Sequence, residues 1–147
     1  RLRRLQDAAS GGLGAGGGDR PHHLVSVPNK RHRIDRVGLS RRKSRGILLN
    51  SVVESWVDMD ADIAAINRGD GRRDGEHFWI HERRYFIKQD GGSYPVEGPG
   101  VHQISGGAYE AVKLYNAYGV SEETDRRLQR IGLSDEDVAI ARRLVGR

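Results

Sequence analysis

The sequence contains no cysteine among its 147 residues, which excludes disulfide bonds and cysteine-ligated zinc and is typical of a reducing compartment. It also contains no apolar run close to 18 residues, so we expect no membrane-spanning helix. The basic and then glycine-rich first 18 residues lack the apolar segment of a signal peptide. These absences leave a chain of one-domain length whose apolar residues are concentrated after residue 46.

Charge is distributed unevenly along the chain. Residues 1–46 carry twelve Lys and Arg against three Asp, whereas the remainder carries thirteen basic against seventeen acidic residues. A basic segment attached to a mildly acidic domain is typical of proteins with a polyanionic partner, although such segments also occur as solvated tails. We therefore predict a flexible, basic, glycine-rich arm over residues 1–46 and a single domain over residues 47–147.

The spacing of apolar residues changes along the expected domain. Residues 47–56 repeat at helical spacing, and a second helix is expected from Asp60 to Gly69. Between residues 77 and 96 the period changes to two, which predicts three short strands joined by turns. Helical spacing returns at residues 108–118, 121–132 and 135–145. The sequence thus predicts an α+β fold, with a small antiparallel sheet of three to four strands flanked by N-terminal and C-terminal helices.

His102 is the most suggestive single residue, because it follows the rigid turn Gly98-Pro99-Gly100. A histidine exchanges a proton near neutral pH and is suited to general acid or base catalysis. In metal-free RNA cleavage, one group removes the proton of the 2′-hydroxyl, another protonates the leaving oxygen, and cations stabilise the phosphorane. The alternative is a structural histidine that bonds a backbone carbonyl.

Further candidates come from the strands on either side of the turns. Arg83 and Arg84 are predicted to supply charge in the catalytic site, and Tyr85 to donate a proton or stack on a base. We assign substrate binding to four more residues, where the aromatic side chains offer stacking surfaces: Lys88, Tyr94, Trp79 and Asn116. The competing interpretation places the aromatic side chains in the core.

The sequence predicts neither a metal site nor a cofactor. His77 and His81 are four residues apart, but in a strand this spacing separates their side chains by ~13 Å, which is too far for one ion. Asp58, Asp60 and Asp62 lack the central glycine and the terminal glutamate of a calcium loop. We find no dinucleotide fingerprint, phosphate loop or nucleophile elbow either.

One segment of the chain resembles a module of small bacterial proteins and of the C-terminal domains of polymorphic toxins. The resemblance covers residues 62–119 and rests on these positions: Ile66, Asn67, Gly69, Phe78, Ile80, Arg83, Tyr85, Gly92, Tyr94, Pro95, Gly98, Pro99, Gly100, His102, Tyr115, Asn116 and Gly119. In that module the first hairpin turn carries Asn-Gly, where this chain has His81-Glu82. Asn-Gly suits the positive backbone angles of a type I′ turn, so we expect a longer or differently twisted hairpin here.

The order of helix and strands is similar to that of small bacterial ribonuclease toxins of the barnase, colicin and RelE type. This resemblance implies a metal-independent ribonuclease that acts on RNA in the cytoplasm, is delivered as part of a larger secreted protein and is held in check by an immunity protein. Two alternatives stay open: a non-enzymatic module that binds nucleic acid or protein, and a phage or secretion-system accessory protein. The sequence carries no signal for an oligomeric state.

Overall fold

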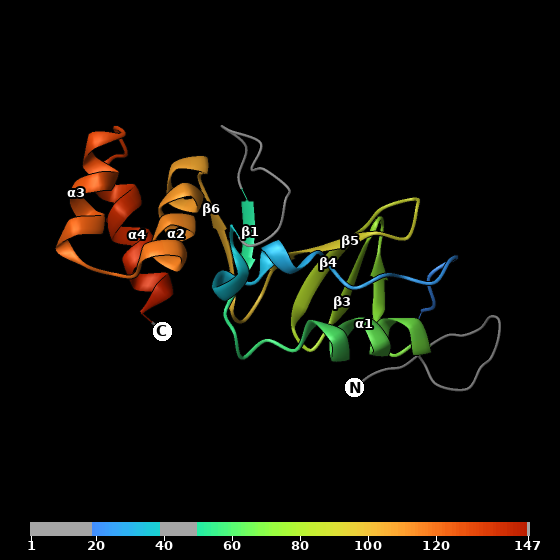
Figure 1. The fold of residues 1–147 in the computed structure, drawn as a ribbon. Coiled ribbons are helices and arrows are strands. Elements are labelled where there is room, and N and C mark those ends of the chain that lie inside the picture. The colour runs from blue at the N-terminus through green and yellow to red at the C-terminus, as the bar shows by residue number, and fades with distance from the viewer. Residues whose placement is uncertain (1–18, 39–49, 147) are drawn as a thin grey trace. The chain divides into compact units, whose positions relative to one another are not determined.

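The computed structural model describes residues 19–38 and 50–146, and these residues form two compact units (Figure 1). Of these described residues, unit 1 comprises 19–28 and 58–99, and unit 2 comprises 29–38, 50–57 and 100–146. The two units therefore alternate along the sequence, and each is built from two separate segments of the chain. The α+β class predicted from the sequence is confirmed, with helices and two small antiparallel sheets. The expected single domain over residues 47–147 is replaced by two units that also include residues 19–38.

Unit 1 packs one helix on a four-stranded meander. Its elements are α1 (Met59–Arg68), β2 (Arg72–Asp74), β3 (His77–Ile80), β4 (Arg83–Ile87) and β5 (Ser93–Glu97), and the strand order is β2-β3-β4-β5. Asp58 caps α1 by accepting a hydrogen bond from the amide of Ala61 at 2.9 Å, and Gly69 ends it in the left-handed conformation. Strands β3, β4 and β5 confirm the three predicted strands, whereas β2 lies in a stretch that we expected to be a loop.

One face of this sheet packs against α1. Phe78 and Tyr85 are opposite each other on β3 and β4, and both are almost completely buried beside Ile63 and Ile66 of α1. Because side chains alternate along a strand, the residues on either side of Phe78 in β3 and of Tyr85 in β4 lie on the other face. This alternation places His77 and Trp79 of β3 with Arg84 and Phe86 of β4.

Residues 19–28 belong to unit 1 rather than to a flexible arm. Val25 is buried and exchanges two hydrogen bonds with the side chain of Asn67, at 2.8 and 3.0 Å. Ser26 donates its amide hydrogen to Gly91 at 2.8 Å. In unit 2, Ile34 and Val37 are buried as well. The predicted arm is therefore wrong for residues 19–38, because a few apolar side chains in this basic stretch reach the cores; residues 1–18 and 39–46 lie outside the described part.

Unit 2 joins a two-stranded sheet to three helices. Its elements are the short 3₁₀ turns η2 (Lys30–His32) and η3 (Ile34–Arg36), strands β1 (Asn50–Val53) and β6 (Val101–Ile104), and helices α2 (Gly106–Tyr118), α3 (Glu122–Arg130) and α4 (Asp135–Val145). The three helices confirm the expected ones. Strand β1 corrects the helix predicted over residues 47–56: its four residues are all buried, and a fully buried strand has no alternation to distinguish it from a helix.

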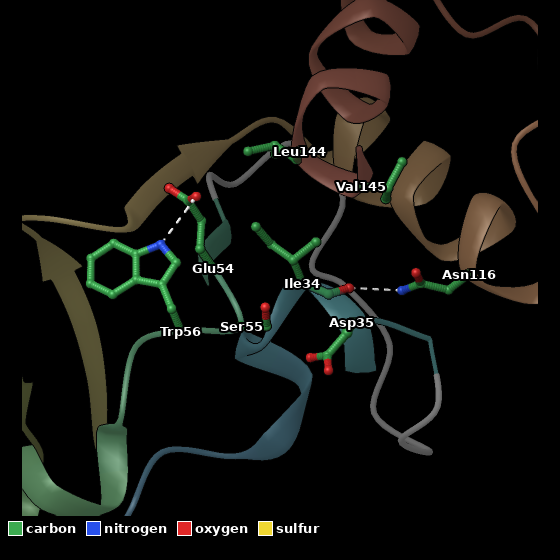
Figure 2. A pocket seen from close by; sticks show the side chains of 8 residues that line it. All are labelled: Ile34, Asp35, Glu54, Ser55, Trp56, Asn116, Leu144 and Val145. Carbon is green, nitrogen blue, oxygen red and sulfur yellow. Dashed lines mark hydrogen bonds between the residues drawn. The ribbon is translucent and has the colours of Figure 1, made fainter. Parts of the chain in front are cut away.

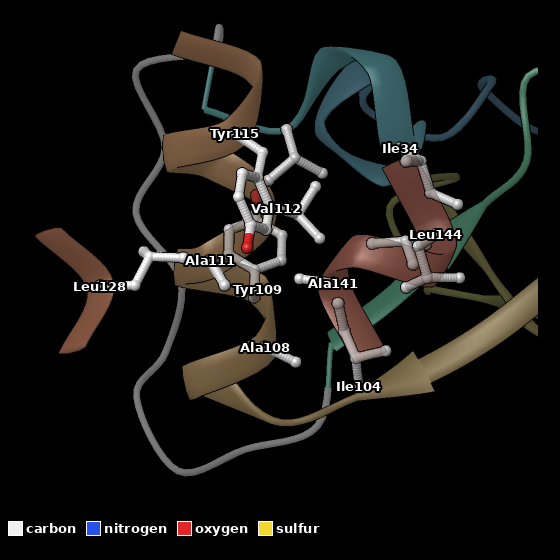
Figure 3. Close-up of a cluster of buried hydrophobic side chains, with 12 residues drawn as sticks. Ile34, Ile104, Ala108, Tyr109, Ala111, Val112, Tyr115, Leu128, Ala141 and Leu144 are labelled. Atoms are coloured by element: carbon white, nitrogen blue, oxygen red, sulfur yellow. The ribbon is translucent and has the colours of Figure 1, made fainter. Parts of the chain in front are cut away.

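The core of unit 2 is formed by apolar side chains that α2, α3, α4, the two strands and η3 contribute (Figure 3). Ala108, Ala111 and Val112 of α2 are completely buried, as are Leu128 of α3 and Ala141 of α4. Serine caps begin all three helices, and each accepts a hydrogen bond from the amide three residues later: Ser105, Ser121 and Ser134. No helix in the described residues is long and apolar enough to cross a membrane.

Candidate functional site

The predicted catalytic residues are divided between the two units. Arg83, Arg84 and Tyr85 lie on β4 of unit 1, whereas His102 lies on β6 of unit 2. The structure therefore does not bring the predicted set together within one unit. The side chains of Arg83, Tyr85 and His102 each make hydrogen bonds within their own unit, and these contacts limit the chemistry that each can perform.

Arg83 and Tyr85 bind a buried carboxylate that the sequence analysis had assigned no role. Asp62 of α1 accepts hydrogen bonds from Arg83 Nε and Nη2 at 2.7 and 3.0 Å and from the hydroxyl of Tyr85. His81 adds a fourth hydrogen bond through Nδ1 at 2.7 Å. The side chain of Asp62 is 1% exposed and that of Arg83 is 10% exposed. These groups hold the helix to the sheet, so neither Arg83 nor Tyr85 is presented to a substrate.

The electrostatics of this Asp62 cluster follow from burial and from its hydrogen bonds. Burial alone would raise the pKa of Asp62, but the hydrogen bonds from Arg83, Tyr85 and His81 outweigh it and hold this pKa below its usual range. The hydrogen bond to Asp62 raises the pKa of Arg83. Burial, followed by the same carboxylate, raises the pKa of the Tyr85 hydroxyl. The cluster is thus an ionised Asp62–Arg83 pair with a neutral tyrosine.

The hairpin beside this cluster contains the only two non-glycine residues with positive φ in the described chain. His81 and Glu82 form a two-residue loop between the paired residues Ile80 and Arg83, with φ of 53° and 67°. These angles are those of a type I′ turn, so the expected longer hairpin is wrong. His81 makes its hydrogen bond to Asp62 from the first position of this turn. Gly98 is required nearby, because an added Cβ there would lie 2.5 Å from the carbonyl oxygen of Glu82.

The opposite face of the sheet carries the predicted aromatic residues. The guanidinium groups of Arg72 and Arg84 lie 5.8 and 5.6 Å from the ring centroid of Trp79, and Asp74 accepts the indole hydrogen at 3.2 Å. On the neighbouring strands β4 and β5, Phe86 and Tyr94 are stacked with ring centroids 5.1 Å apart, and the ring of His77 on β3 meets Phe86 edge-on at 5.3 Å. Lys88 follows β4.

In unit 2, His102 is paired with a carboxylate. Its Nε2 lies 2.9 Å from Glu54 Oε2, and the side chains are 30% and 14% exposed. The pair arises from strand register: His102 is opposite Val52, and the amide of Glu54 bonds the carbonyl of Gly100 at 2.9 Å, so Glu54 lies diagonally across from the histidine. This arrangement differs from the alternative in which His102 bonds a backbone carbonyl.

Glu54 also lines a pocket of about 90 Å³ (Figure 2). Trp56 donates its indole hydrogen to Glu54 Oε1 at 3.3 Å. The lining also contains a second carboxylate, that of Asp35, together with apolar side chains. The full lining is Ile34, Asp35, Glu54, Ser55, Trp56, Asn116, Leu144 and Val145. Asn116, which was predicted to bind substrate, has a structural role here: its side-chain amide donates hydrogen bonds to the carbonyls of Ile34 and Val37 at 2.8 and 3.0 Å.

A basic segment lies next to this pair. Arg33 forms a parallel β-bridge with Val53, the residue before Glu54, and the adjoining 3₁₀ turns carry further cations: Lys30, Arg31 and Arg36. Arg33 itself makes an exposed ion pair with Asp35 at 3.3 Å. The backbone of this cationic segment thus pairs with β1, the strand that leads into Glu54. Among residues 19–38 and 50–146, no three potential metal-ligating side chains come together.

Sequence reasoning had missed both acidic partners, Asp62 and Glu54. Asp62 had been weighed only as part of a calcium loop, and Glu54 had been placed in a helix. Comparisons with family models, curated proteins and solved structures give no match to the chain. The resemblance to polymorphic-toxin modules therefore stays a prediction.

Proposed function

We propose that unit 2 is a metal-independent ribonuclease in which Glu54 and His102 form the acid–base pair. The observation that carries the proposal is their hydrogen bond at 2.9 Å beside a basic segment. A carboxylate and an imidazole provide the two proton-transferring groups that RNA cleavage requires, and neither needs a metal ion.

The chemistry assigns each group a step. Glu54 accepts the proton of the 2′-hydroxyl while the 2′-oxygen attacks the neighbouring phosphorus. Protonated His102 gives its proton to the departing 5′-oxygen. The products are a 2′,3′-cyclic phosphate and a 5′-hydroxyl. In the free protein the two groups bond each other, so the substrate phosphodiester replaces this bond. Arg33 and the cations of η2 and η3 stabilise the charge that develops on phosphorus.

A toxin of this kind requires a substrate, a place of action and an inhibitor, and the proposal includes all three. RNA is the substrate, the cytoplasm is the place of action after delivery within a larger secreted protein, and an immunity protein is the inhibitor. Cationic residues near the pair favour this reading, since RNA binding through phosphates depends on them. Of the residues first assigned to catalysis, His102 retains that role, and Glu54 replaces Arg83, Arg84 and Tyr85.

The test is cleavage of several single-stranded and structured RNAs with and without a chelator. We expect cleavage to be unaffected by the chelator and to fall ~10²–10⁴-fold in Glu54→Gln and in His102→Gln. Glu110→Gln is the matched control, because Glu110 pairs with Lys113 on the surface of α2. Circular dichroism melting checks that each variant is folded.

Three results would overturn the proposal. An inert wild-type protein on all RNAs would favour the non-enzymatic interaction module instead. Full activity of Glu54→Gln would remove the carboxylate from the mechanism. Products ending in a 3′-hydroxyl would point to a different reaction, because attack by the 2′-oxygen always leaves a cyclic phosphate.

A further inference from the structure

We propose that unit 1 carries a separate site that binds single-stranded nucleic acid by stacking bases on the sheet face opposite α1. We call this surface the aromatic face; its members are Arg72, Trp79, Arg84, His77, Phe86 and Tyr94. The site lies in unit 1, so it is distinct from the pair Glu54–His102 and does not depend on catalysis.

The aromatic face is built by strand register rather than by neighbours in sequence. Arg72, Trp79 and Arg84 are successive partners across β2, β3 and β4, and His77, Phe86 and Tyr94 are successive partners across β3, β4 and β5. All except the exposed Arg72 are half-buried. Within unit 1, α1 and residues 19–28 contact residues of the buried face or the ends of the strands. The rings on the aromatic face thus form a partly exposed surface.

The chemistry of this face suits bases and phosphates together. Aromatic rings and guanidinium planes are the groups on which unpaired bases stack, and here Trp79 has a guanidinium group on each neighbouring strand. Both carboxylates at the face are engaged: Asp74 holds the indole hydrogen and Glu97 pairs with Arg84 at 2.7 Å. Arg72 and Lys88 then bring net positive charge to the phosphates, which favours a polyanion over a neutral or basic peptide, and the rings favour a nucleic acid because its bases can stack on them.

The spacing of the rings decides between single and double strands. Trp79 and Phe86 are diagonal neighbours across β3 and β4, a relation that places side chains about 7–8 Å apart. Bases in a duplex are separated by about 3.4 Å along the axis and have both faces covered by their neighbours. Two successive bases therefore reach both rings only when the strand is unpaired and its bases are unstacked. The aromatic face accordingly selects single strands.

The experiment measures binding of the full chain to a labelled single-stranded DNA, which has no 2′-hydroxyl and cannot be cleaved by the proposed reaction. In a Trp56→Phe background, Trp79 is the remaining tryptophan, and we expect the single strand to quench its fluorescence. Trp79→Ala should weaken binding roughly 5- to 140-fold, the equivalent of one stacked base. A duplex of the same sequence should bind more weakly, and single-stranded RNA should behave as the DNA does.

Each contrary outcome is informative. Equal affinity for duplex and single strand, or an unchanged affinity in Trp79→Ala, would show that phosphate contacts alone bind the nucleic acid and would overturn stacking. Absence of binding to any oligonucleotide would also overturn the site and leave a protein partner as the occupant of this face. The quenching measurement keeps the test valid if Trp79→Ala is unstable, because it needs no change on the aromatic face. Loss of RNA cleavage in Glu54→Gln with quenching retained would separate the two sites.

Discussion

The interiors of the two units are stabilised by different kinds of interaction. In unit 1, one helix is joined to a sheet by a buried carboxylate that binds Arg83, Tyr85 and His81. In unit 2, three helices and two strands meet in an apolar cluster where Ala111, Val112 and Leu128 are fully buried. Polar clusters fix one geometry but leave uncompensated charge when broken, whereas apolar cores lose stability in proportion to the volume removed.

The units also differ in charge. Among the described residues, unit 2 carries ten Lys and Arg against nine Asp and Glu, whereas unit 1 carries seven against ten. Unit 2 is thus nearly neutral and unit 1 is acidic, so phosphate binding depends on where the cations lie: in η2 and η3 of unit 2, and beside the aromatic rings of unit 1. This division matches the two proposals, in which one unit cleaves the strand and the other stacks its bases.

The largest expected effect comes from Asp62→Asn. The substitution removes the charge that balances Arg83 in a buried site, and breaking such a pair costs about 3–5 kcal/mol. The chain has one tryptophan in each unit, so Trp56→Phe leaves Trp79 to report on unit 1 and Trp79→Phe leaves Trp56 to report on unit 2. Denaturant unfolding of Asp62→Asn should shift the Trp79 transition and leave the Trp56 transition nearly in place.

The matched control for Asp62 is Asp60→Asn, which changes an exposed carboxylate in the same helical turn. Its effect should stay below about 1 kcal/mol, because it loses only an interaction with the helix dipole. Equal shifts for the two variants would show that the Asp62 cluster contributes little. Equal shifts of both tryptophan transitions in Asp62→Asn would show that the units unfold as one.

A cavity in the other core should produce the reverse pattern. Leu128→Ala removes a completely buried side chain of unit 2, and such substitutions cost about 2–5 kcal/mol. The Trp56 transition should move to lower denaturant and the Trp79 transition should stay. Leu24→Ala serves as the control, since Leu24 is 79% exposed and its loss should be nearly neutral. An unshifted Trp56 transition in Leu128→Ala would contradict the core described for unit 2.

Acid should weaken unit 1 through the same carboxylate. The pKa of Asp62 is lower in the folded protein than in the unfolded chain, so its contribution to stability is complete above the ordinary Asp value of about 4 and is lost as pH falls below it. The Trp79 transition should therefore shift over this range. Asp62→Asn should flatten this dependence, and an equally steep dependence in the variant would assign it to other carboxylates.

Much of the fold follows from local sequence signals, and the failures have physical causes. Alternation identified β3, β4 and β5, and helical spacing identified α2, α3 and α4. Strand β1 was missed because all four of its residues are buried, so that it shows no period of two. Strand β6 was missed because its partner lies about fifty residues earlier in the chain, beyond any local pattern.

The candidate sites were harder to predict, since each depends on pairs that are distant in sequence. His102 was found because the preceding turn marked it, but Glu54 is 48 residues away and only the β1–β6 register brings them together. Trp79 and Tyr94 were selected as aromatic residues with stacking surfaces, and the sheet does place them on one face. Arg83 and Tyr85 were assigned to catalysis because of their side-chain chemistry. The alternation along the strand does not reveal that their face meets a buried carboxylate, so their structural role was missed.

The smallest expected effect concerns the strained hairpin of unit 1. Glu82 has φ of 67°, a conformation that glycine adopts at less cost, so Glu82→Gly should raise the stability of unit 1 by up to about 1 kcal/mol. Glu76→Gly is the matched control, because Glu76 lies in the other two-residue turn of the sheet without a positive φ, and there glycine should be neutral or destabilising. The Trp79 unfolding transition in the Trp56→Phe background measures both variants. A loss of stability in Glu82→Gly would mean that the hydrogen bond from His81 to Asp62 already compensates the turn, so that only the entropic cost of glycine remains.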